Sequence, residues 1–232
     1  ADAETSSPRL AALLKKLDSQ QNDGFDVLLV YLLHERFVLK NKSKWWPYLD
    51  LLPTVPEVSV SHPLFFDEEE MNLYLGGSDV RKFILRNQRR AFERHTALAS
   101  DVDVHEVLGS NVILDKSIVY WATAILDSRS IWWDGRRNLV PLLDLVNADT
   151  IGRAHETKVE ESFAVTRASR PVSAGEQIYE NYQQPNYLLF AFHFFMLDHN
   201  PSDCALLGGL SINRNDPGFK VANRFQSSPT FC

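Results

Sequence analysis

The spacing of hydrophobic residues changes near residue 128, and this change restricts the fold more than any other feature of the chain. Before that point apolar side chains recur every three or four residues, which predicts helices over residues 9–20 and 25–40. After it the apolar runs are short and are interrupted by proline and glycine, which is typical of short strands. We therefore expect an α+β fold, in which a mainly helical segment of residues 1–127 packs beside a core of short strands at residues 128–208.

Local signals place the ends of several elements. Asp67, Ser78 and Asp115 each precede a helical pattern and can accept hydrogen bonds from the free N–H groups of a first turn. The helix after Ser78 carries basic residues on its outward side, which we interpret as a solvated face. A dense aromatic run predicts a helix over residues 186–196. The strands are expected over three stretches: residues 139–146, 162–166 and 177–179.

The last part of the chain and its overall charge allow only broad statements. Residues 209–232 are polar, and we interpret them either as a tail or as the start of a truncated substrate-binding region. The formal net charge of -6 argues against direct nucleic-acid binding, which needs clustered Lys and Arg. No run approaches the roughly 20 apolar residues of a membrane span, so no membrane partner is expected. The partners that we still expect are a protein substrate or a partner protein.

The cysteine content bears on metals and on the compartment. Cys204 and Cys232 are too few and too far apart for a zinc cluster or a disulfide framework, so we expect no metal site. We predict a reducing compartment. The sequence does not distinguish the cytoplasm, the nucleus and an organelle matrix such as that of a plastid.

A set of residues in the second half carries the chemical signal, while common enzyme signatures such as HExxH and GxSxG are absent from the sequence. It consists of Arg129, the run LVPLLDLVN ending at Asn147, and the run SAGEQIYENY ending at Tyr182. QPNYLLFAFHFF follows. Taken singly, these residues have plain structural interpretations too. Asn147 could pair with backbone groups at a turn, and Tyr179 and Tyr182 could be core aromatics.

Together these runs resemble the second half of a SET domain, in the branch of the Rubisco large-subunit lysine methyltransferases and the actin-histidine methyltransferase. In that family an Arg ends a helix, a strand leads to an Asn–His pair, and an AGEQI turn precedes a strand with the catalytic Tyr. Arg129, Asn147, Ala174 to Ile178 and Tyr182 match this order. The early run SKWWPYLDLLP is also similar to a run of the family, and the resemblance covers about residues 9–208.

The resemblance implies a SET-domain fold and an S-adenosyl-L-methionine-dependent N-methyltransferase that acts on a protein lysine or histidine. It implies that Tyr182 is catalytic and that Arg129, Asn147 and Tyr179 contact the cofactor. Trp132 and Phe194 would border the substrate channel. Aromatic faces suit such a channel, because they attract an amine or methylated amine cation.

Four departures from the family pattern support an alternative. No Gly-x-Gly turn precedes residue 9, and Ala148 replaces the His of the Asn–His pair. Gln183 and Phe194 stand where the family has glycine. Gln183 adopts positive φ less cheaply than glycine, and Phe194 adds a bulky ring close to the expected channel. The alternative is a catalytically impaired SET-fold subunit of a multiprotein complex. In that case Trp45, Trp46, Trp132 and Trp133 would contact partner proteins.

Overall fold

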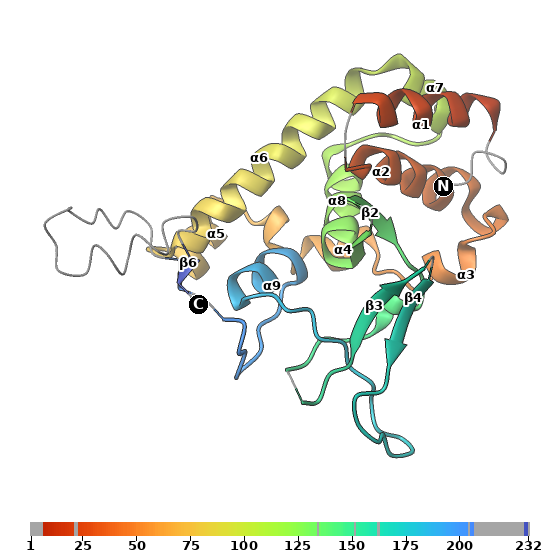
Figure 1. The fold of residues 1–232 in the computed structure, drawn as a ribbon. Helices are drawn as coiled ribbons and strands as arrows, with labels where there is room; N and C mark the ends of the chain where they lie inside the picture. The colour runs from red at the N-terminus through yellow and green to blue at the C-terminus, as the bar shows by residue number, and fades with distance from the viewer. Residues whose placement is uncertain are drawn as a thin grey trace, which may run out of the picture.

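The structure is a computed structural model that describes residues 7–20, 23–133, 135–150, 152–161 and 163–203, together with the backbone of 205–206 and 230–231. Figure 1 shows the helices of the first half above a smaller part made of short strands and long connections. The helices are α1 (Pro8–Gln20), α2 (Phe25–Leu33), α3 (Trp46–Leu49), α4 (Val55–Ser59), α5 (Glu68–Leu75), α6 (Asp79–Ser100), α7 (Val102–Leu108), α8 (Lys116–Arg129) and α9 (Asn186–His193). The strands are β1 (Ser130–Trp133), β2 (Arg136–Leu139), β3 (Glu156–Glu160), β4 (Phe163–Arg167), β5 (Ala205–Leu206) and β6 (Thr230–Phe231).

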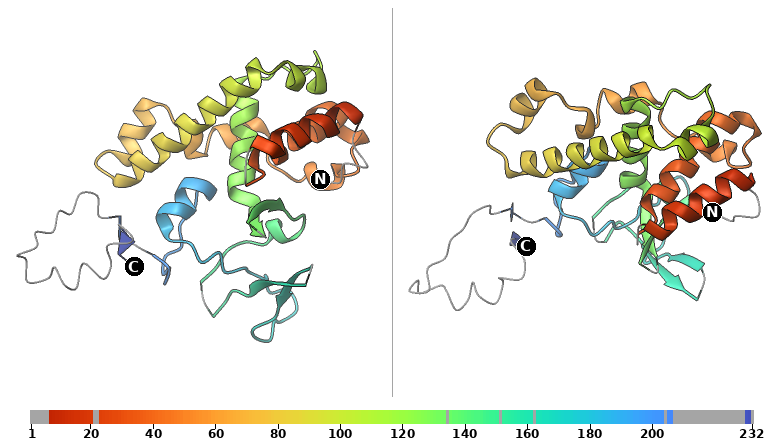
Figure 2. Two further views of the ribbon diagram at one scale, coloured as in Figure 1. Left: turned by 45° about the horizontal axis from the view of Figure 1, so that its top comes forward. Right: turned by 90° about the horizontal axis from the view of Figure 1, so that it is seen from above.

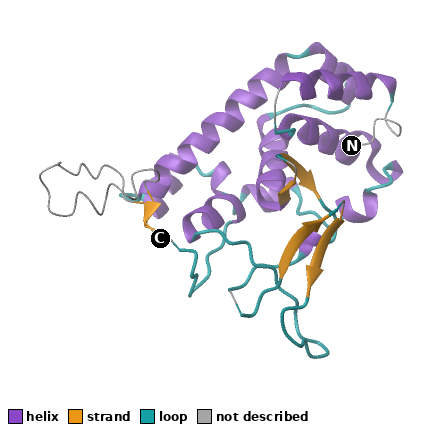
Figure 3. Ribbon diagram, in the orientation of Figure 1, coloured by secondary structure: helices purple, strands orange, loops and turns teal. Residues whose placement is uncertain are grey.

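This arrangement confirms the expected α+β class, with helices through α8 and, after it, short strands together with helix α9 (Figure 3). In the described residues the strands form three two-stranded antiparallel pairs, β1–β2, β3–β4 and β5–β6. Cys204 and Cys232 lie outside the described residues, as does most of the predicted tail. The division of the chain at residue 128 into two parts stays a prediction.

The helix caps follow from the local sequence. Asp67 and Thr54 form capping boxes with the glutamate three residues later, which satisfies two N–H groups at each start. Ser78 and Asp115 cap α6 and α8 through side-chain oxygens that accept backbone N–H groups, as expected. The helix predicted over residues 25–40 is α2 followed by a π-helical turn at His34–Leu39.

Helix α8 is the centre of the core. Every residue from Val119 to Leu126 is buried, so this helix is covered on all sides. It packs against α2, α4, α6 and α9, and Figure 2 shows these elements around it from two further directions. The indole N–H of Trp121 donates to the carbonyl of Pro53 at 2.8 Å. This packing fixes the last turn of α8, which ends in Arg129.

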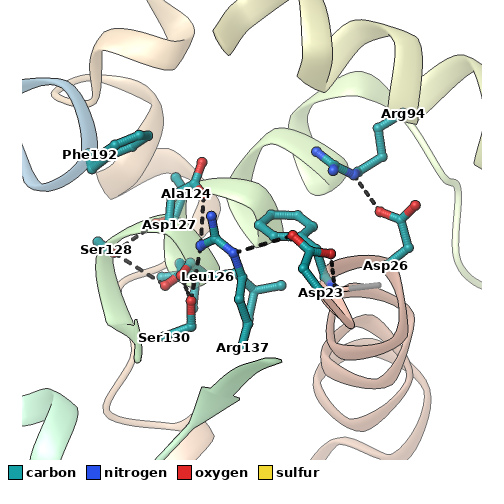
Figure 4. A network of polar contacts seen from close by, with 12 residues as sticks. Asp23, Asp26, Arg94, Ala124, Leu126, Asp127, Ser128, Ser130, Arg137 and Phe192 are labelled. Carbon is teal, nitrogen blue, oxygen red and sulfur yellow. Dashed lines mark hydrogen bonds and ion pairs between the residues drawn. The ribbon is translucent and has the colours of Figure 1, made fainter. Parts of the chain in front are cut away.

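A polar network holds this end of α8 against its neighbours (Figure 4). Arg137 of β2 donates to Asp127 Oδ1 at 3.3 Å and to Ser130 Oγ at 3.2 Å. Its guanidinium carbon lies 5.0 Å from the ring centre of Phe25, and that of Arg94 lies 4.1 Å from the same ring. These contacts join α2, α6, α8 and β2. The start of the strand-bearing part is therefore tied to the helical core.

Two of the expected strands are wrong, and one is confirmed. β4 covers the strand expected over 162–166. Over 139–146 the chain instead turns: Leu142 has φ of 77°, and a short 3-10 helix covers Leu143–Leu145. Pro141 has no N–H to donate to a strand ladder, which explains why the apolar run does not continue as a strand.

The segment expected as a strand over 177–179 is not part of a strand, and the bridges form at the next residue instead. Glu180 forms isolated parallel bridges with Ala148 on one side and with His155 on the other. Its N–H donates to the carbonyl of Asn147 at 2.9 Å, and the N–H of Asn181 donates to the carbonyl of His155 at 2.9 Å. The segment at Glu180 therefore lies between two earlier stretches of chain, one at Asn147 and Ala148 and the other at His155. We call this arrangement the crossing, and it positions Tyr182, two residues after Glu180.

Candidate active site

Two adjoining cavities lie where α8, α9 and the crossing meet. The first has a volume of about 330 Å³ and the second about 290 Å³. Five residues border both cavities and form the wall between them: Ser128, Arg129, Asp144, Tyr182 and His193. Each cavity is in the size range of small-ligand sites or just below it. A group that passes from one cavity to the other must therefore pass these side chains.

Tyr182 is the aromatic part of this wall. Its hydroxyl donates to the carbonyl of Val146 at 2.9 Å, one residue before Asn147. Its ring lies 5.2 Å from the ring of His193 and 6.4 Å from that of Phe195. Burial raises the pKa of Tyr182, so the hydroxyl stays protonated at neutral pH. It can orient a neighbouring polar group but does not act as a base there.

An ion pair forms the polar part of the wall. Arg129 Nη1 donates to the backbone carbonyl of Asp144 at 3.1 Å and lies 3.3 Å from its carboxylate Oδ2. The hydroxyl of Tyr48 also donates to Oδ2 at 2.6 Å. The Asp144 side chain is only 1% exposed, and its other oxygen, Oδ1, has no partner among the described residues. A buried carboxylate oxygen without a donor favours a ligand that supplies one.

Two histidines border the first cavity. Leu64 N–H donates to His62 Nδ1 at 3.2 Å, so His62 carries its proton on Nε2 and donates it to the carbonyl of Phe192 at 3.0 Å. The second histidine, His193, follows Phe192 in the chain. Its Nε2 is buried and has no hydrogen-bond partner among the described residues. Burial, followed by the electrostatic influence of His62 and of the positively charged Arg129, lowers the pKa of His193 to about 4. His193 is therefore neutral at physiological pH.

The structure brings together five of the six residues that the sequence analysis singled out. Arg129, Asn147, Tyr182 and Phe194 line the first cavity, and Trp132 lines the second. Tyr179 borders neither cavity. Its ring lies 5.3 Å from the guanidinium carbon of Arg153 instead. The chemical roles of all six residues stay predictions.

Asn147 and Trp132 sit at the open sides of the two cavities. Asn147 is exposed, and its backbone carbonyl is used in the crossing through Glu180, so its side-chain amide is available to a ligand. Trp132 is 58% exposed and lies 5.2 Å from the guanidinium carbon of Arg137. A large aromatic face at the mouth of a cavity suits a cationic side chain.

Phe194 narrows the first cavity without filling it. It is 41% exposed, and its ring packs at 5.7 Å from Phe190 and 6.1 Å from Phe66. It ends α9 with a φ of 58°, and Gln183, next to Tyr182, has a φ of 51°. Both positions where the family pattern has glycine thus keep the backbone that glycine favours. The backbone of the site is retained although the side chains differ.

Four residues of the wall and its surroundings were not predicted from the sequence: Ser128, Asp144 and His193 of the wall, and His62 beside it. Asp144 lies within the quoted run LVPLLDLVN, and a charged residue in an apolar run is a signal for a paired, buried group. His193 lies in the run QPNYLLFAFHFF, directly before Phe194. No neighbouring residue in the sequence indicates that a ring nitrogen of His193 lacks a hydrogen-bond partner. His62 comes from the helical half, so its position was not predictable without the fold.

The helical segment, the short hairpins and the crossing together make up a fold that solved structures share. Comparison with solved structures identifies this fold in Rubisco LSMT bound to AdoMet, with a TM-score of 0.63 and 21% identity over 96% of this chain. The SET domain of LSMT bound to lysine and AdoHcy matches with a TM-score of 0.63 and 22% identity over 96% of this chain. Rubisco LSMT bound to sinefungin and monomethyllysine matches with a TM-score of 0.62 and 23% identity over 89% of this chain.

These matches establish the fold, as the resemblance in the sequence predicted. The chain spans about half the length of the structures it matches, since it covers 51%, 52% and 48% of those chains. No protein-family model matches the chain, and no curated protein matches it. Among the described residues no helix is long and apolar enough to cross a membrane. The described residues also contain no group of three or more His, Cys, Asp or Glu side chains placed to hold a metal ion.

Proposed function

We propose that this chain is an S-adenosyl-L-methionine-dependent N-methyltransferase that acts on a lysine or histidine side chain of a protein. The observation that carries the proposal is the shared wall between the two cavities. Asn147 lies on the first side, Trp132 on the second, and Tyr182 borders both. This is the arrangement that transfer of a small group between two bound molecules requires, because positioning supplies most of the rate.

The residues of the first cavity fit the cofactor. Asp144 borders this cavity, and its buried Oδ1 has no partner among the described residues. S-adenosyl-L-methionine carries an ammonium group, hydroxyls and an amino-substituted ring that can donate to such an atom. Arg129 and the Asn147 amide would hold its polar groups. When bound, the cofactor supplies a methyl group on a positively charged sulfur.

The second cavity suits the acceptor side chain. The ring of Trp132 would hold an amine cation, and the positive charge of Arg129 in the wall would disfavour the charge of that cation further in. A lysine ammonium must lose a proton before it can attack, and desolvation lowers its pKa in that direction. The Tyr182 hydroxyl would then orient the amine in the wall. A histidine acceptor would need no such deprotonation.

The test is methyl transfer by Tyr182→Phe. We expect turnover to fall about 10²-fold or more, as for the loss of one oriented hydrogen bond at a transition state. AdoHcy affinity should stay nearly unchanged in a calorimetric titration. Tyr187→Phe is the matched control, because Tyr187 borders neither cavity and packs against Phe83 at 6.0 Å. Undiminished turnover in Tyr182→Phe would remove this residue from the catalytic role.

A second candidate is a structural subunit of a multiprotein complex. The observation that favours it is a group of exposed apolar side chains around α4, α5 and the end of α9: Val60, Leu73, Tyr74 and Met196 are 80%, 73%, 63% and 65% exposed. Of the four tryptophans predicted to contact partners, Trp45 and Trp132 are exposed, while Trp46 and Trp133 are half-buried. Stable co-migration with other proteins, together with no AdoHcy binding, would favour this candidate over the enzyme.

A further inference from the structure

His193 occupies the wall between the two cavities from the end of α9. Its ring lies 5.2 Å from the ring of Tyr182, at an interplanar angle of 46°, and 5.8 Å from the ring of Phe195. These aromatic neighbours fix the plane of the imidazole. Because it borders both cavities, His193 faces the point at which a group would pass between them.

The nitrogen chemistry of His193 is unused, in contrast to that of the neighbouring histidine. Both ring nitrogens of His62 are engaged, one by Leu64 N–H and the other by the carbonyl of Phe192. His193 Nε2 is buried and has no hydrogen-bond partner among the described residues. A buried polar atom of this kind lowers the stability of the protein unless a ligand pairs with it. In this protein the unpaired nitrogen lies in the wall where a group would pass between the two cavities.

The charge state of His193 selects the kind of ligand group. Burial lowers its pKa to about 4, and the positive charge of Arg129 acts in the same direction. The ring is therefore neutral at pH 7 and can accept a hydrogen bond at one nitrogen. A protonated imidazole could only donate. The neutral ring can therefore pair with an N–H donor at the nitrogen that carries no proton.

We propose that the acceptor is a lysine and that the neutral imidazole of His193 accepts a hydrogen bond from its deprotonated amine, the nitrogen that receives the methyl group. This inference rests on the proposed methyltransferase function and adds a catalytic residue that the sequence analysis did not identify. His193 positions the acceptor nitrogen beside Tyr182 by accepting its hydrogen, and the proton stays on that nitrogen. It is not the base that deprotonates a lysine, since an imidazole of such low basicity does not hold the proton at neutral pH.

Sinefungin and AdoHcy provide the test, because sinefungin carries an amine-bearing carbon where AdoHcy has a bare sulfur. That amine stands at the position of the transferred methyl group, next to the acceptor nitrogen, and should therefore reach the same hydrogen-bond acceptor in the wall. We therefore measure the ratio of sinefungin affinity to AdoHcy affinity by calorimetric titration of the folded chain. In His193→Phe this ratio should fall roughly tenfold, the expected effect of losing one hydrogen bond to a charged group. AdoHcy affinity should change by less than about threefold.

Two further variants keep the test interpretable. His193→Gln retains a hydrogen-bonding amide near the position of Nε2 and should keep most of the ratio. His199→Phe removes an exposed histidine outside both cavities and should leave the ratio unchanged. An unchanged ratio in His193→Phe, with AdoHcy still bound, would overturn the role of His193 alone. Failure of the wild-type chain to bind AdoHcy or sinefungin would instead overturn the proposed function, and this inference with it.

A direct readout needs no variant. With ¹⁵N-labelled histidine, the Nε2 signal of His193 in the wild-type chain should shift on addition of sinefungin toward the value of a nitrogen that accepts a hydrogen bond. AdoHcy should cause a smaller change. Equal responses to the two ligands would contradict the contact with the acceptor nitrogen.

Discussion

Gln183→Gly tests whether the site keeps a glycine-type backbone under strain. Gln183 follows Tyr182 and has a φ of 51°, in the left-handed region. A non-glycine residue there costs roughly 1–2 kcal/mol relative to its right-handed conformation. Glycine removes that cost but loses more chain entropy on folding, about 0.5–1 kcal/mol. The net expectation is a gain in unfolding free energy of about 0.5–1 kcal/mol.

The contacts of Gln183 add no further contribution to this estimate of the unfolding free energy. Its side chain is exposed, and its backbone N–H donates to Asn181 Oδ1 at 3.0 Å, a bond that glycine retains. For a chain of 232 residues the gain corresponds to a rise in Tm of about 1–4 °C. Equilibrium urea unfolding and a thermal scan followed by circular dichroism measure both quantities.

Gln177→Gly is the matched control, since Gln177 is exposed and is not among the described residues with positive φ. At this position glycine only increases the chain entropy that is lost on folding, so the unfolding free energy should fall by about 0.5–1 kcal/mol. The two substitutions should therefore change the unfolding free energy in opposite directions. A loss of stability in Gln183→Gly equal to that in Gln177→Gly would refute the reasoning that residue 183 is strained.

Two further predictions concern buried acids. Tyr48→Phe removes the 2.6 Å hydrogen bond to Asp144 and should lower the unfolding free energy by about 1–3 kcal/mol, whereas Tyr74→Phe, at an exposed ring, should change it little. If the two variants unfold at the same urea concentration, the bond to Asp144 contributes nothing to stability. Burial raises the pKa of Asp127 from 3.8 to about 6, so the folded state binds its proton more tightly than the unfolded state. The resulting stabilisation is complete below pH 3.8 and is lost as pH rises through 6, so wild type should lose up to about 3 kcal/mol relative to Asp127→Asn from pH 4 to pH 7. Urea unfolding of both proteins at a series of pH values measures this difference, and a constant difference would contradict the pKa shift.

The sequence predicted elements well where one local signal determines them. The capping residues Asp67, Ser78 and Asp115 begin helices as expected, because the acceptor oxygen and the following helical pattern are adjacent in the chain. The strand expected over 139–146 failed because β pairing depends on a distant partner, and Pro141 cannot complete a ladder. Local apolar pattern alone does not identify that partner.

The same distinction holds for the site. Arg129, Asn147 and Tyr182 were found through the resemblance of short runs, and the fold brings them to one cavity. His62 comes from the helical half, and its contact with the carbonyl of Phe192 spans 130 residues. No local pattern predicts a contact across such a separation. The unused nitrogen of His193 likewise becomes apparent only when burial and hydrogen bonds are known.

The most direct measurement is a crystal structure of the chain grown with AdoHcy. We expect the ligand in the first cavity, in contact with Arg129 and Asn147, with its sulfur directed toward the Tyr182 wall and the second cavity beyond it. Crystals grown at saturating AdoHcy in which the ligand binds elsewhere, or in which the first cavity holds only solvent, would contradict the proposal that this SET fold binds the cofactor for methyl transfer.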